Sequence, residues 1–438
     1  MPKTNDSAGA WRNWAGNQRA VAAAVAMPRS TGEVVETVRS AAERGRVVKP
    51  VGSSHSFSGA AATSGVRVEL AHISGVVGVN RAERLVRVRA GTLLATLNAD
   101  LAAHGLAMPN LGDIDAQTVS GALATGTHGT GAAYGCLSTF VSELELVTGT
   151  GEVVRCSDTV RPEVFAAARV GVGAVGIVTE VTLRCVDAFV LHAQERPAPL
   201  REVLSAIDEH VAVNDHFEFY WMPYTERTLT KANNRAAADS APRSRFATWF
   251  HEDLLENTVI GGVGRLCRAM PSLTPTLLRA TARFFSPRVY TERSDVVFTS
   301  PRRVRFVEME YGLPRAALPE AFAGLRRVIG SLPFNVAMPV EVRFTAGDDI
   351  WLSHGYARDN AYIAIHQFIG MPFEEYFRGF EGICTPLGGR PHWGKMHYRD
   401  AASLSTAYPR FGDFLAVRDQ LDPDRVFSND YIRTILGP

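Results

Sequence analysis

The chain has 438 residues, of which 46% are hydrophobic and 21% charged, and its formal net charge is +1. This length predicts two or three domains, and the composition is typical of a soluble globular protein. The near-zero net charge gives no electrostatic reason to expect nucleic acid or an anionic membrane surface as a partner. We also expect no membrane span, because no apolar run is long enough to cross a bilayer.

The cysteines and the first residues indicate the compartment. The five cysteines are scattered without Cys-x-x-Cys spacing, which disfavours both a zinc site and a disulfide framework. Residues 1–7 are polar and lack the apolar core of a signal peptide. We therefore expect a cytoplasmic protein in a reducing compartment.

The first 186 residues predict an α+β domain. Ser30 is expected to start a helix that ends before Gly45, and Thr92 is expected to cap a second helix that ends near Gly105. Short strands alternate with these helices. They are expected at residues 46–50, 68–70, 76–79, 85–90, 143–148, 152–156 and 177–184.

The pattern changes near Asp187, where the glycine-rich phrases stop and aromatic clusters appear, so we place a domain boundary there. Residues 233–245 are rich in Ala, Arg, Asn and Ser and are expected to be a mobile loop. Residues 305–311, 340–344 and 362–368 alternate in polarity, which predicts strands of a second sheet.

Residues 51–56, Val-Gly-Ser-Ser-His-Ser, place a histidine in a turn of small residues directly after a β-type run. Such a turn leaves several backbone N–H groups unpaired, which suits a phosphate group. His55 would then lie near whatever extends beyond the phosphate. The alternative is a surface turn with a solvent-facing histidine.

Residues 120–131 form a second stretch dominated by small residues, and residues 109–113 precede it with another glycine. Backbone approaches a ligand closely only where side chains are absent, so this run could wrap a pyrophosphate or a flat ring. A flexible loop is the alternative.

Two further glycine motifs do not indicate nucleotide binding. Residues 171–176 match Gly-x-Gly-x-x-Gly, but a helix is expected before them and a strand after, the reverse of the dinucleotide-binding order. Residues 389–395 have the spacing of a P-loop, yet Met396 replaces the Ser or Thr that would hold magnesium.

Charged side chains and histidines in the C-terminal half of the chain are candidates for catalysis. Glu341 and Arg343 share one face of a predicted strand, where they form either a structural salt bridge or a catalytic pair. Lys395 could stabilise developing negative charge, or it is an ordinary solvated lysine. His366 could join them or be a satisfied sheet histidine. His392 and His397 lack metal-ligand spacing, so we expect no metal.

Together these phrases resemble the vanillyl-alcohol-oxidase-type flavoproteins, and in particular the sugar-1,4-lactone oxidase branch, which includes gulonolactone and arabinonolactone oxidoreductases and the alditol oxidases. The resemblance runs nearly end to end. The similar phrases lie at residues 11–16, 51–57, 109–131, 173–183, 341–343, 390–395 and 421–423.

The resemblance implies a two-part FAD-binding domain and a cap domain built on an antiparallel sheet with flanking helices. Residues 1–186 would form the FAD-binding domain, residues 187–415 the substrate-binding cap, and residues 416–438 a segment that returns to the FAD domain. His55 matches the position at which relatives attach the flavin covalently. The residues that match cofactor contacts are Pro50, Val51, Gly52, Ser53, Ser54, His55, Ser56, Asn110, Gly112, Asp113, Thr118, Gly121, Ala122, Leu123, Ala124, Thr127, His128, Ile177, His392 and Lys395.

The same resemblance assigns catalysis and substrate binding to Glu341, Arg343, His366 and Lys395, with Asp113 as a further substrate contact. Arg343 and Lys395 would hold the alkoxide-like oxygen and the reduced flavin. Either Glu341 or His366 would take the hydroxyl proton. Asp113 stands where alditol oxidases carry serine, which favours a lactone over a linear alditol.

The expected function is FAD-dependent oxidation of a carbinol of a sugar-derived substrate, an aldono-1,4-lactone of the L-gulono, L-galactono or D-arabinono type, with O2 or another electron acceptor. Gly112 matches a position where bulkier residues hinder oxygen in some relatives. The alternatives are a sugar-alcohol oxidase, an oxidase that tailors a sugar in secondary metabolism, and a catalytically silent nucleotide- or sugar-binding protein.

Overall fold

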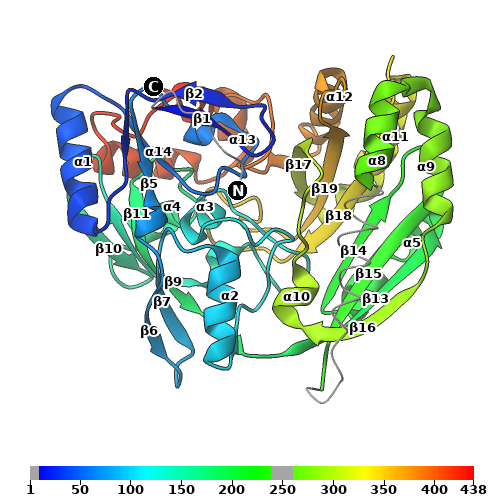
Figure 1. The fold of residues 1–438 in the computed structure, drawn as a ribbon, viewed down its shortest axis with the longest axis horizontal. Helices are drawn as coiled ribbons and strands as arrows, with labels where there is room; N and C mark the ends of the chain where they lie inside the picture. The colour runs from blue at the N-terminus through cyan, green and yellow to red at the C-terminus, as the bar shows by residue number, and fades with distance from the viewer. Residues whose placement is uncertain (1–8, 238–259) are drawn as a thin grey trace.

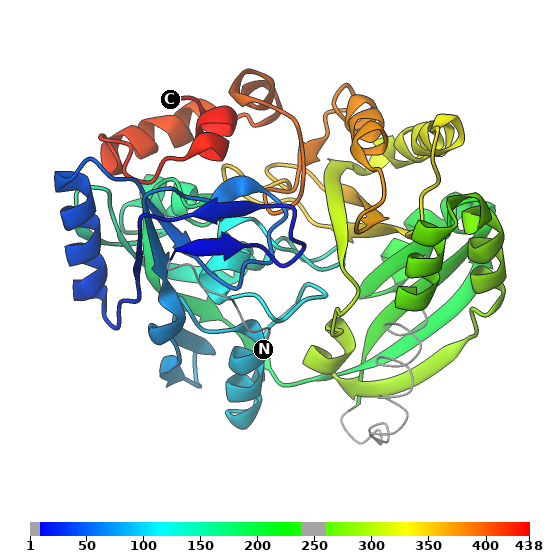
Figure 2. The same ribbon diagram turned by 45° about the horizontal axis from the view of Figure 1, so that its top comes forward.

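The structure is a computed structural model that describes residues 9–237 and 260–438. Two lobes lie side by side in Figure 1, and the first and last elements of the described chain belong to the same lobe. The blue to teal elements of the N-terminal part form that lobe together with the orange-red and red C-terminal helices, and most of the green to orange-brown elements between them form the other. Figure 2 shows the same division from a second direction.

A five-stranded antiparallel sheet in the order β10-β9-β11-β7-β6 forms the centre of the first lobe. In β7, Val86 and Val88 are buried whereas Arg87 and Arg89 are exposed, as the alternation in the sequence predicts. Helices pack against this sheet in one apolar core. The elements are β6 (Val76–Asn80), β7 (Leu85–Arg89), α2 (Leu94–Ala103), α3 (Val119–Ala124), β9 (Val141–Val147), β10 (Val153–Ser157), α4 (Pro162–Ala168) and β11 (Ile177–Arg184).

A three-stranded parallel sheet in the order β3-β5-β4 lies in the same lobe beside helix α1 (Thr31–Glu43). The predicted helix start is confirmed, because the Ser30 side chain accepts a hydrogen bond from the Glu33 N–H and Gly45 follows the helix with φ +60°. The small elements of this region are β1 (Ala10–Arg12), β2 (Arg19–Val21), β3 (Ala24–Ala26), β4 (Val48–Val51), β5 (Val66–Glu69), β8 (Leu106–Ala107) and β12 (Val186–Asp187).

The prediction that Thr92 caps a helix is wrong. Helix α2 begins two residues later, and its N-cap position is Leu93, which makes no side-chain cap hydrogen bond. Thr92 Oγ1 instead accepts from the Gly75 N–H at 2.8 Å and donates to the Arg89 carbonyl at 2.7 Å. The hydroxyl therefore fixes the end of β7 rather than the start of the helix.

The second lobe is built on an eight-stranded antiparallel sheet in the order β16-β13-β15-β14-β18-β19-β17-β20. Helices α5, α6, α11 and α12 share an apolar core with it. The elements are β13 (Val190–Pro199), α5 (Leu200–Ser205), α6 (Ile207–Val213), β14 (His216–Trp221), β15 (Arg227–Ala236), α8 (Ile260–Ala269), α9 (Thr274–Arg283), β16 (Arg288–Arg293), α10 (Ser294–Phe298), β17 (Phe306–Pro314), α11 (Leu318–Ser331), β18 (Val340–Thr345), β19 (Asn360–Phe368), α12 (Glu374–Cys384) and β20 (Arg390–Pro391).

The central strands of this sheet are more buried than their alternation predicts. Every residue of β19 is buried, and so is every residue of β17 except Pro314. Their polar side chains therefore point into covered space rather than to solvent. The loop predicted at residues 233–245 is partly wrong, because β15 extends to Ala236, and residues 238–245 lie outside the described part of the chain.

After β20 the chain returns to the first lobe in helices α13 (Ala401–Ala407), α14 (Phe411–Leu421) and α15 (Asp430–Leu436). Leu404, Phe414 and Ile432 from these helices join the apolar core of the first lobe. In the described ranges, no helix has the length and apolar character needed to cross a membrane.

Candidate active site

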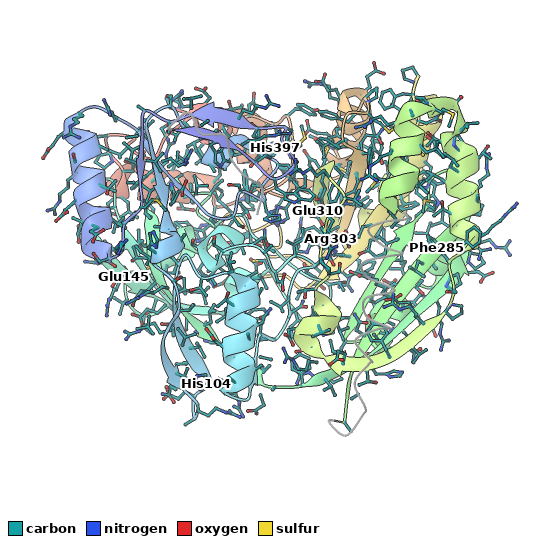
Figure 3. The ribbon with its side chains drawn as sticks, viewed as in Figure 1. His104, Glu145, Phe285, Arg303, Glu310 and His397 are labelled. Carbon is teal, nitrogen blue, oxygen red and sulfur yellow. The ribbon has the colours of Figure 1, made fainter. Side chains whose placement is uncertain are left out.

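Two cavities meet in the structure. His55, Ser56, Gln117 and Thr125 line both of them, so together they form one elongated cleft. The first cavity is enclosed by loops of the first lobe, and the second lies where these loops face the eight-stranded sheet. Figure 3 shows Glu310, which lines the second cavity, between the two lobes.

The residues predicted to bind phosphate lie in the loop that follows β4, and they line the first cavity. Ser54 adopts φ +61°, an unusual conformation for a residue with a side chain. Trp11 Nε1 donates to Ser54 Oγ at 2.9 Å, and the Trp14 N–H donates to the Ser54 carbonyl at 2.8 Å. The tryptophans near the N-terminus therefore hold this loop in its strained shape.

His55 extends from this loop to the junction of the two cavities. Its ring stacks on Trp14, with 5.6 Å between the ring centroids, and its Nδ1 atom is buried without a hydrogen-bond partner in the described chain. Burial, with a smaller contribution from Lys395, lowers the pKa of His55 to about 4. The imidazole is therefore neutral at pH 7, which is the nucleophilic form.

The opposite wall of the first cavity comes from helix α3 and from the loop between α4 and β11. The predicted loop at residues 120–131 contains this helix, whose first turn is capped by Thr118 Oγ1 accepting from the Gly121 N–H at 3.3 Å. Thr118, Gly121 and Ala124 face the cavity. Gly173, from the rejected Gly-x-Gly-x-x-Gly motif, lines it as well, with a helix before it and a strand after, as expected.

Four predicted cofactor residues line neither cavity, because their side chains serve the fold. Asn110 Nδ2 donates to the Thr130 carbonyl at 3.1 Å. Ala122 and Leu123 point into the apolar core of the first lobe, and Ile177 is buried beneath the parallel sheet. The remaining predicted cofactor residues line one of the two cavities.

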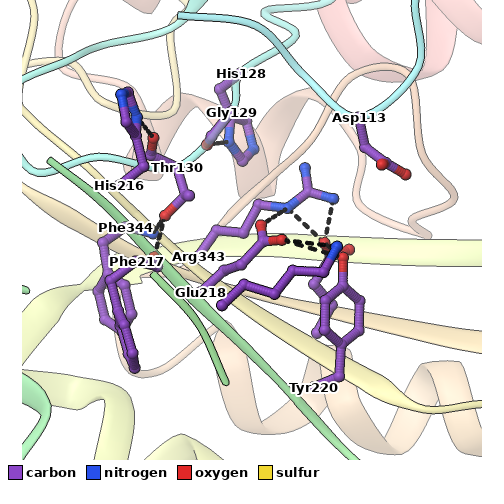
Figure 4. A network of polar contacts seen from close by, with 12 residues as sticks. Asp113, His128, Gly129, Thr130, His216, Phe217, Glu218, Tyr220, Arg343 and Phe344 are labelled. Carbon is purple, nitrogen blue, oxygen red and sulfur yellow. Dashed lines mark hydrogen bonds and ion pairs between the residues drawn. The ribbon is translucent and has the colours of Figure 1, made fainter. Parts of the chain in front are cut away.

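Glu341 and Arg343 lie together on β18 at the second cavity. Arg343 Nε donates to Glu341 Oε1 at 2.7 Å, and Tyr220 Oη donates to the same oxygen at 2.6 Å. Figure 4 shows Arg343 beside Tyr220 and Glu218 in this network. Lys231 forms an ion pair with Glu218 at 3.6 Å behind it. The surroundings thus fix the guanidinium of Arg343 toward the cavity.

Lys395 and His366 meet at Glu308, a residue of β17 that the sequence analysis did not select. Glu308 Oε2 forms an ion pair with Lys395 Nζ, and Glu308 Oε1 lies 3.4 Å from His366 Nε2. Burial opposes ionisation of Glu308, but Lys395 and His366 outweigh it and lower its pKa to about 2. The Lys395 ammonium is therefore positioned by a buried carboxylate rather than free in solvent.

His128, Glu310 and His392 form a second buried cluster at this cavity, and their possible ligand atoms lie within 4.8 Å of one another. His128 Nε2 lies 3.4 Å from Glu310 Oε1. His392 Nδ1 accepts from the Gly394 N–H at 3.0 Å, so a neutral His392 carries its proton on Nε2 and offers no free lone pair to a cation there. The expected absence of a metal stays a prediction.

The Asp113 carboxylate binds two side chains of the second lobe. Arg302 Nε donates to Asp113 Oδ2 at 2.8 Å, and Ser300 Oγ donates to Oδ1 at 2.8 Å. Burial raises the pKa of Asp113, but Arg302 and nearby cations hold it at about 2. Asp113 lines the second cavity as an ionised group that joins the two lobes.

One sequence signal could have found two of the site residues that the sequence analysis did not select. Glu308 and Glu310 stand two apart on a strand that is otherwise mostly apolar, which is the same pattern that selected Glu341 and Arg343. Tyr220 and Arg302 carry no comparable local signal, because they reach the cavity from a strand and a loop that are distant in the sequence.

Comparison with known proteins identifies the family. Residues 22–157 match the family described as FAD binding domain, and residues 181–435 match D-arabinono-1,4-lactone oxidase. The chain is 42% identical over 431 residues to L-gulono-1,4-lactone dehydrogenase of Mycobacterium tuberculosis, which covers 98% of this chain and 99% of that protein. It is 33% identical over 436 residues to L-gulonolactone oxidase of Bos taurus, with 97% and 98% covered.

The chain belongs to the D-arabinono-1,4-lactone oxidase family. The resemblance and the fold class stated from the sequence are confirmed. Cholesterol oxidase from B. sterolicum shares the fold, with a TM-score of 0.83 over 100% of this chain and 99% of that chain, at 20% identity. This member of the lactone oxidase family is an FAD-linked oxidoreductase.

The cleft fits FAD. Small residues and a strained turn line the first cavity, which suits a pyrophosphate held by backbone N–H groups. The second cavity offers charged and aromatic side chains instead, and the unpaired Nδ1 of His55 is buried at the junction. Residues of the loop after β4 and of α3 would hold the phosphate half, and residues around His55, Gly112 and His392 would surround the ring.

Proposed function

We propose that the chain oxidises a carbinol of an aldono-1,4-lactone of the L-gulono, L-galactono or D-arabinono type. The names of the relatives support a sugar-lactone substrate. The observation that carries the proposal is the convergence of Glu341, Arg343, Lys395 and His366 on one cavity, at the end of the cleft that follows His55.

When bound, FAD accepts a hydride from the carbinol carbon, and the protein supplies binding and electrostatics. Arg343 and Lys395 hold the hydroxyl oxygen and stabilise the negative charge that develops on it. Glu341 and Glu218 keep Arg343 directed at this point, and Tyr220 holds Glu341. A carboxylate or imidazole at the same cavity accepts the hydroxyl proton, and Glu341 and His366 are the two candidates.

A substrate panel tests this function. Purified protein is mixed without oxygen with aldono-1,4-lactones, alditols and glycosides, and bleaching of the flavin absorbance is followed. We expect a lactone to bleach it fastest. Admission of O2 then shows whether O2 or another electron acceptor reoxidises the enzyme. A protein that binds FAD but is bleached by none of these compounds would contradict the proposal.

We further propose that His55 is bonded covalently to the flavin. The support is its neutral imidazole and its place at the junction of the cavities. In acid-precipitated wild-type protein the yellow colour is expected to stay in the pellet, and in His55→Ala it should move to the supernatant. Colour wholly in the wild-type supernatant would refute the bond.

The cytoplasm is the proposed location. The support is that all five cysteines are free and buried, as in proteins of a reducing compartment. Fractionation of the native cells, with the activity followed by the lactone assay, tests this location.

A further inference from the structure

Strand β17 carries two buried glutamates that each face a histidine. Glu308 and Glu310 are 3% and 2% exposed, and both line the second cavity because residues two apart share one face of a strand. Glu308 faces His366 on β19, and Glu310 faces His128 from the loop after α3. The mechanism proposed above assigns no task to either glutamate.

The hydrogen bonds of His366 determine where its protons lie. His366 Nδ1 is 2.9 Å from the carbonyl oxygen of Pro339, which can only accept, so Nδ1 carries a proton. Nε2 then faces Glu308 Oε1 at 3.4 Å. With a single proton on the ring, a nitrogen lone pair would face a carboxylate oxygen. A second proton on Nε2 replaces this repulsion with a charge-assisted contact.

That second proton does not belong to Glu308. The other carboxylate oxygen of Glu308 forms an ion pair with the Lys395 ammonium, which stabilises the ionised carboxylate. Burial favours the neutral acid, but Lys395 and His366 outweigh it and hold the pKa of Glu308 at about 2. The carboxylate therefore stays charged, and it faces Nε2 as an acceptor.

The second couple repeats this arrangement independently. His128 Nδ1 donates to the Gly129 carbonyl at 2.8 Å, and His128 Nε2 faces Glu310 Oε1 at 3.4 Å. The pKa of Glu310 is also held well below its usual range, against burial, by His128 and Lys395. In both couples a backbone carbonyl fixes the proton on Nδ1, and a glutamate of β17 faces Nε2.

We propose that Glu308 is a positioning residue that keeps His366 protonated on both nitrogens, so that His366 contributes positive charge at the substrate oxygen and does not accept the hydroxyl proton. This inference rests on the proposed oxidation. It leaves Glu341 as the acceptor of the two candidates. The C–H electron pair then leaves as hydride to FAD, the O–H proton passes to the Glu341 carboxylate, and the carbonyl forms.

Several charged groups surround His366 and contribute to its state. Glu308 contacts His366, and Lys395 pairs with Glu308. The other charged or titratable groups that line the same cavity come from both lobes. These are His55, Asp113, His128, Tyr220, Arg302, Glu310, Glu341, Arg343 and His392.

The test is the protonation state of His366 in the FAD-loaded enzyme, measured by nitrogen NMR of protein labelled with [15N]histidine. The chain has 12 histidines, so the His366 signals are identified as those lost in His366→Gln. At pH 7.5 we expect both His366 nitrogens to carry protons in the wild type and in Glu308→Asp, which keeps the charge. In Glu308→Gln we expect one proton only.

Glu310→Gln is the matched control, because it removes the corresponding carboxylate from the other couple on the same strand. It should leave the His366 signals in the doubly protonated form. A singly protonated His366 in the wild type overturns the proposal, and so does a doubly protonated one in Glu308→Gln. If Glu308→Gln does not fold, the wild-type and Glu308→Asp spectra decide.

Kinetics supply a second measurement. In Glu308→Gln the anaerobic rate of flavin reduction by a lactone should fall on the order of 10²-fold, the usual effect of removing one stabilising group, while bound FAD is retained. Glu308→Asp should recover most of this rate. The NMR measurement needs no substrate. A wild type inactive on every sugar would therefore contradict the proposed function and leave the His366 result standing.

Discussion

Lys49 is a buried lysine that closes the first lobe around the phosphate loop. It lies on β4, is 1% exposed, and its Nζ donates to the carbonyls of Gly173 at 2.9 Å and Phe427 at 3.0 Å. Burial lowers the pKa of Lys49 from 10.5 to about 7, although Asp422 partly opposes this effect. One side chain thus joins the phosphate loop, the loop after α4 and the C-terminal segment.

The lowered pKa of Lys49 predicts that the stability of the protein depends on pH. Between pH 7 and 10.5 the unfolded chain holds a proton on Lys49 that the folded chain lacks, so this group makes unfolding harder as the pH rises. Between those two pKa values the contribution grows by about 1.4 kcal/mol per pH unit. Chemical denaturation gives the free energy of unfolding of the wild type and of Lys49→Met at pH 7.5 and 9.0. The difference between the two proteins should be larger at pH 9.0.

The Lys49→Met variant supplies the comparison because methionine keeps the apolar stem and removes the amine. Other groups that titrate in this range are shared by both proteins and cancel. A wild type whose stability relative to Lys49→Met stays constant between the two pH values would show that the amine is not the group responsible.

At the scale of the elements, the start of α3 and the turn after β4 fit tightly against each other. A Cβ added at Gly52 would lie 2.3 Å from Thr118 Oγ1, closer than two such atoms can approach. The same Oγ1 caps α3. Thr118 therefore leaves room only for glycine at position 52. Both residues line the cavity assigned to FAD phosphates.

We expect the effects of changing these two residues to be strongly non-additive. Gly52→Ala should weaken FAD retention and stability because Thr118 must move, and Thr118→Ala should cost about 1 kcal/mol through the lost cap. In the double variant the clash is gone. Its loss of stability should therefore be smaller than the sum of the two single losses by roughly 1–3 kcal/mol. Urea denaturation of the four proteins measures the coupling, and simple additivity would exclude the contact.

The sequence predicts elements where local chemistry decides and fails where distant contacts decide. Ser30 and the strand alternation at residues 85–89 act locally, and these predictions are confirmed. Thr92 has the local signal of a helix cap, but contact with Gly75 gives its hydroxyl another task. α3 is short and rich in small residues, so its sequence reads as a loop until its packing in the core is known.

The same limit applies to the site. Most residues selected from the glycine-rich phrases and the charged pairs line the cleft, because the resemblance supplied the long-range arrangement. Tyr220 was missed because it reaches the site only when β14 and β18 lie side by side in one sheet. Glu308 was missed although it has the same local pattern as Glu341 and Arg343. The roles of the site residues and the boundaries at residues 187 and 416 stay predictions.

For the whole molecule, the relation between the lobes decides whether the site is complete. The first lobe supplies the loop with His55, and the second supplies Glu341, Arg343 and His366. Asp113 bridges the two lobes at the second cavity, through Arg302 and Ser300. This ion pair is partly buried, with side-chain exposures of 17% for Asp113 and 27% for Arg302.

We expect Asp113→Asn to loosen the closure of the lobes. Breaking a buried ion pair costs about 3–5 kcal/mol, and because Arg302 is partly exposed we expect a loss of roughly 2 kcal/mol in the free energy of unfolding. Because looser lobes hold the substrate cavity less firmly, KM for the lactone should rise more than kcat falls. Asp187→Asn removes a far more exposed carboxylate, which pairs with Arg81 and Arg84, and should destabilise the protein much less. An equal loss in the two variants, or an unchanged KM in Asp113→Asn, would show that this ion pair does not hold the substrate cavity closed.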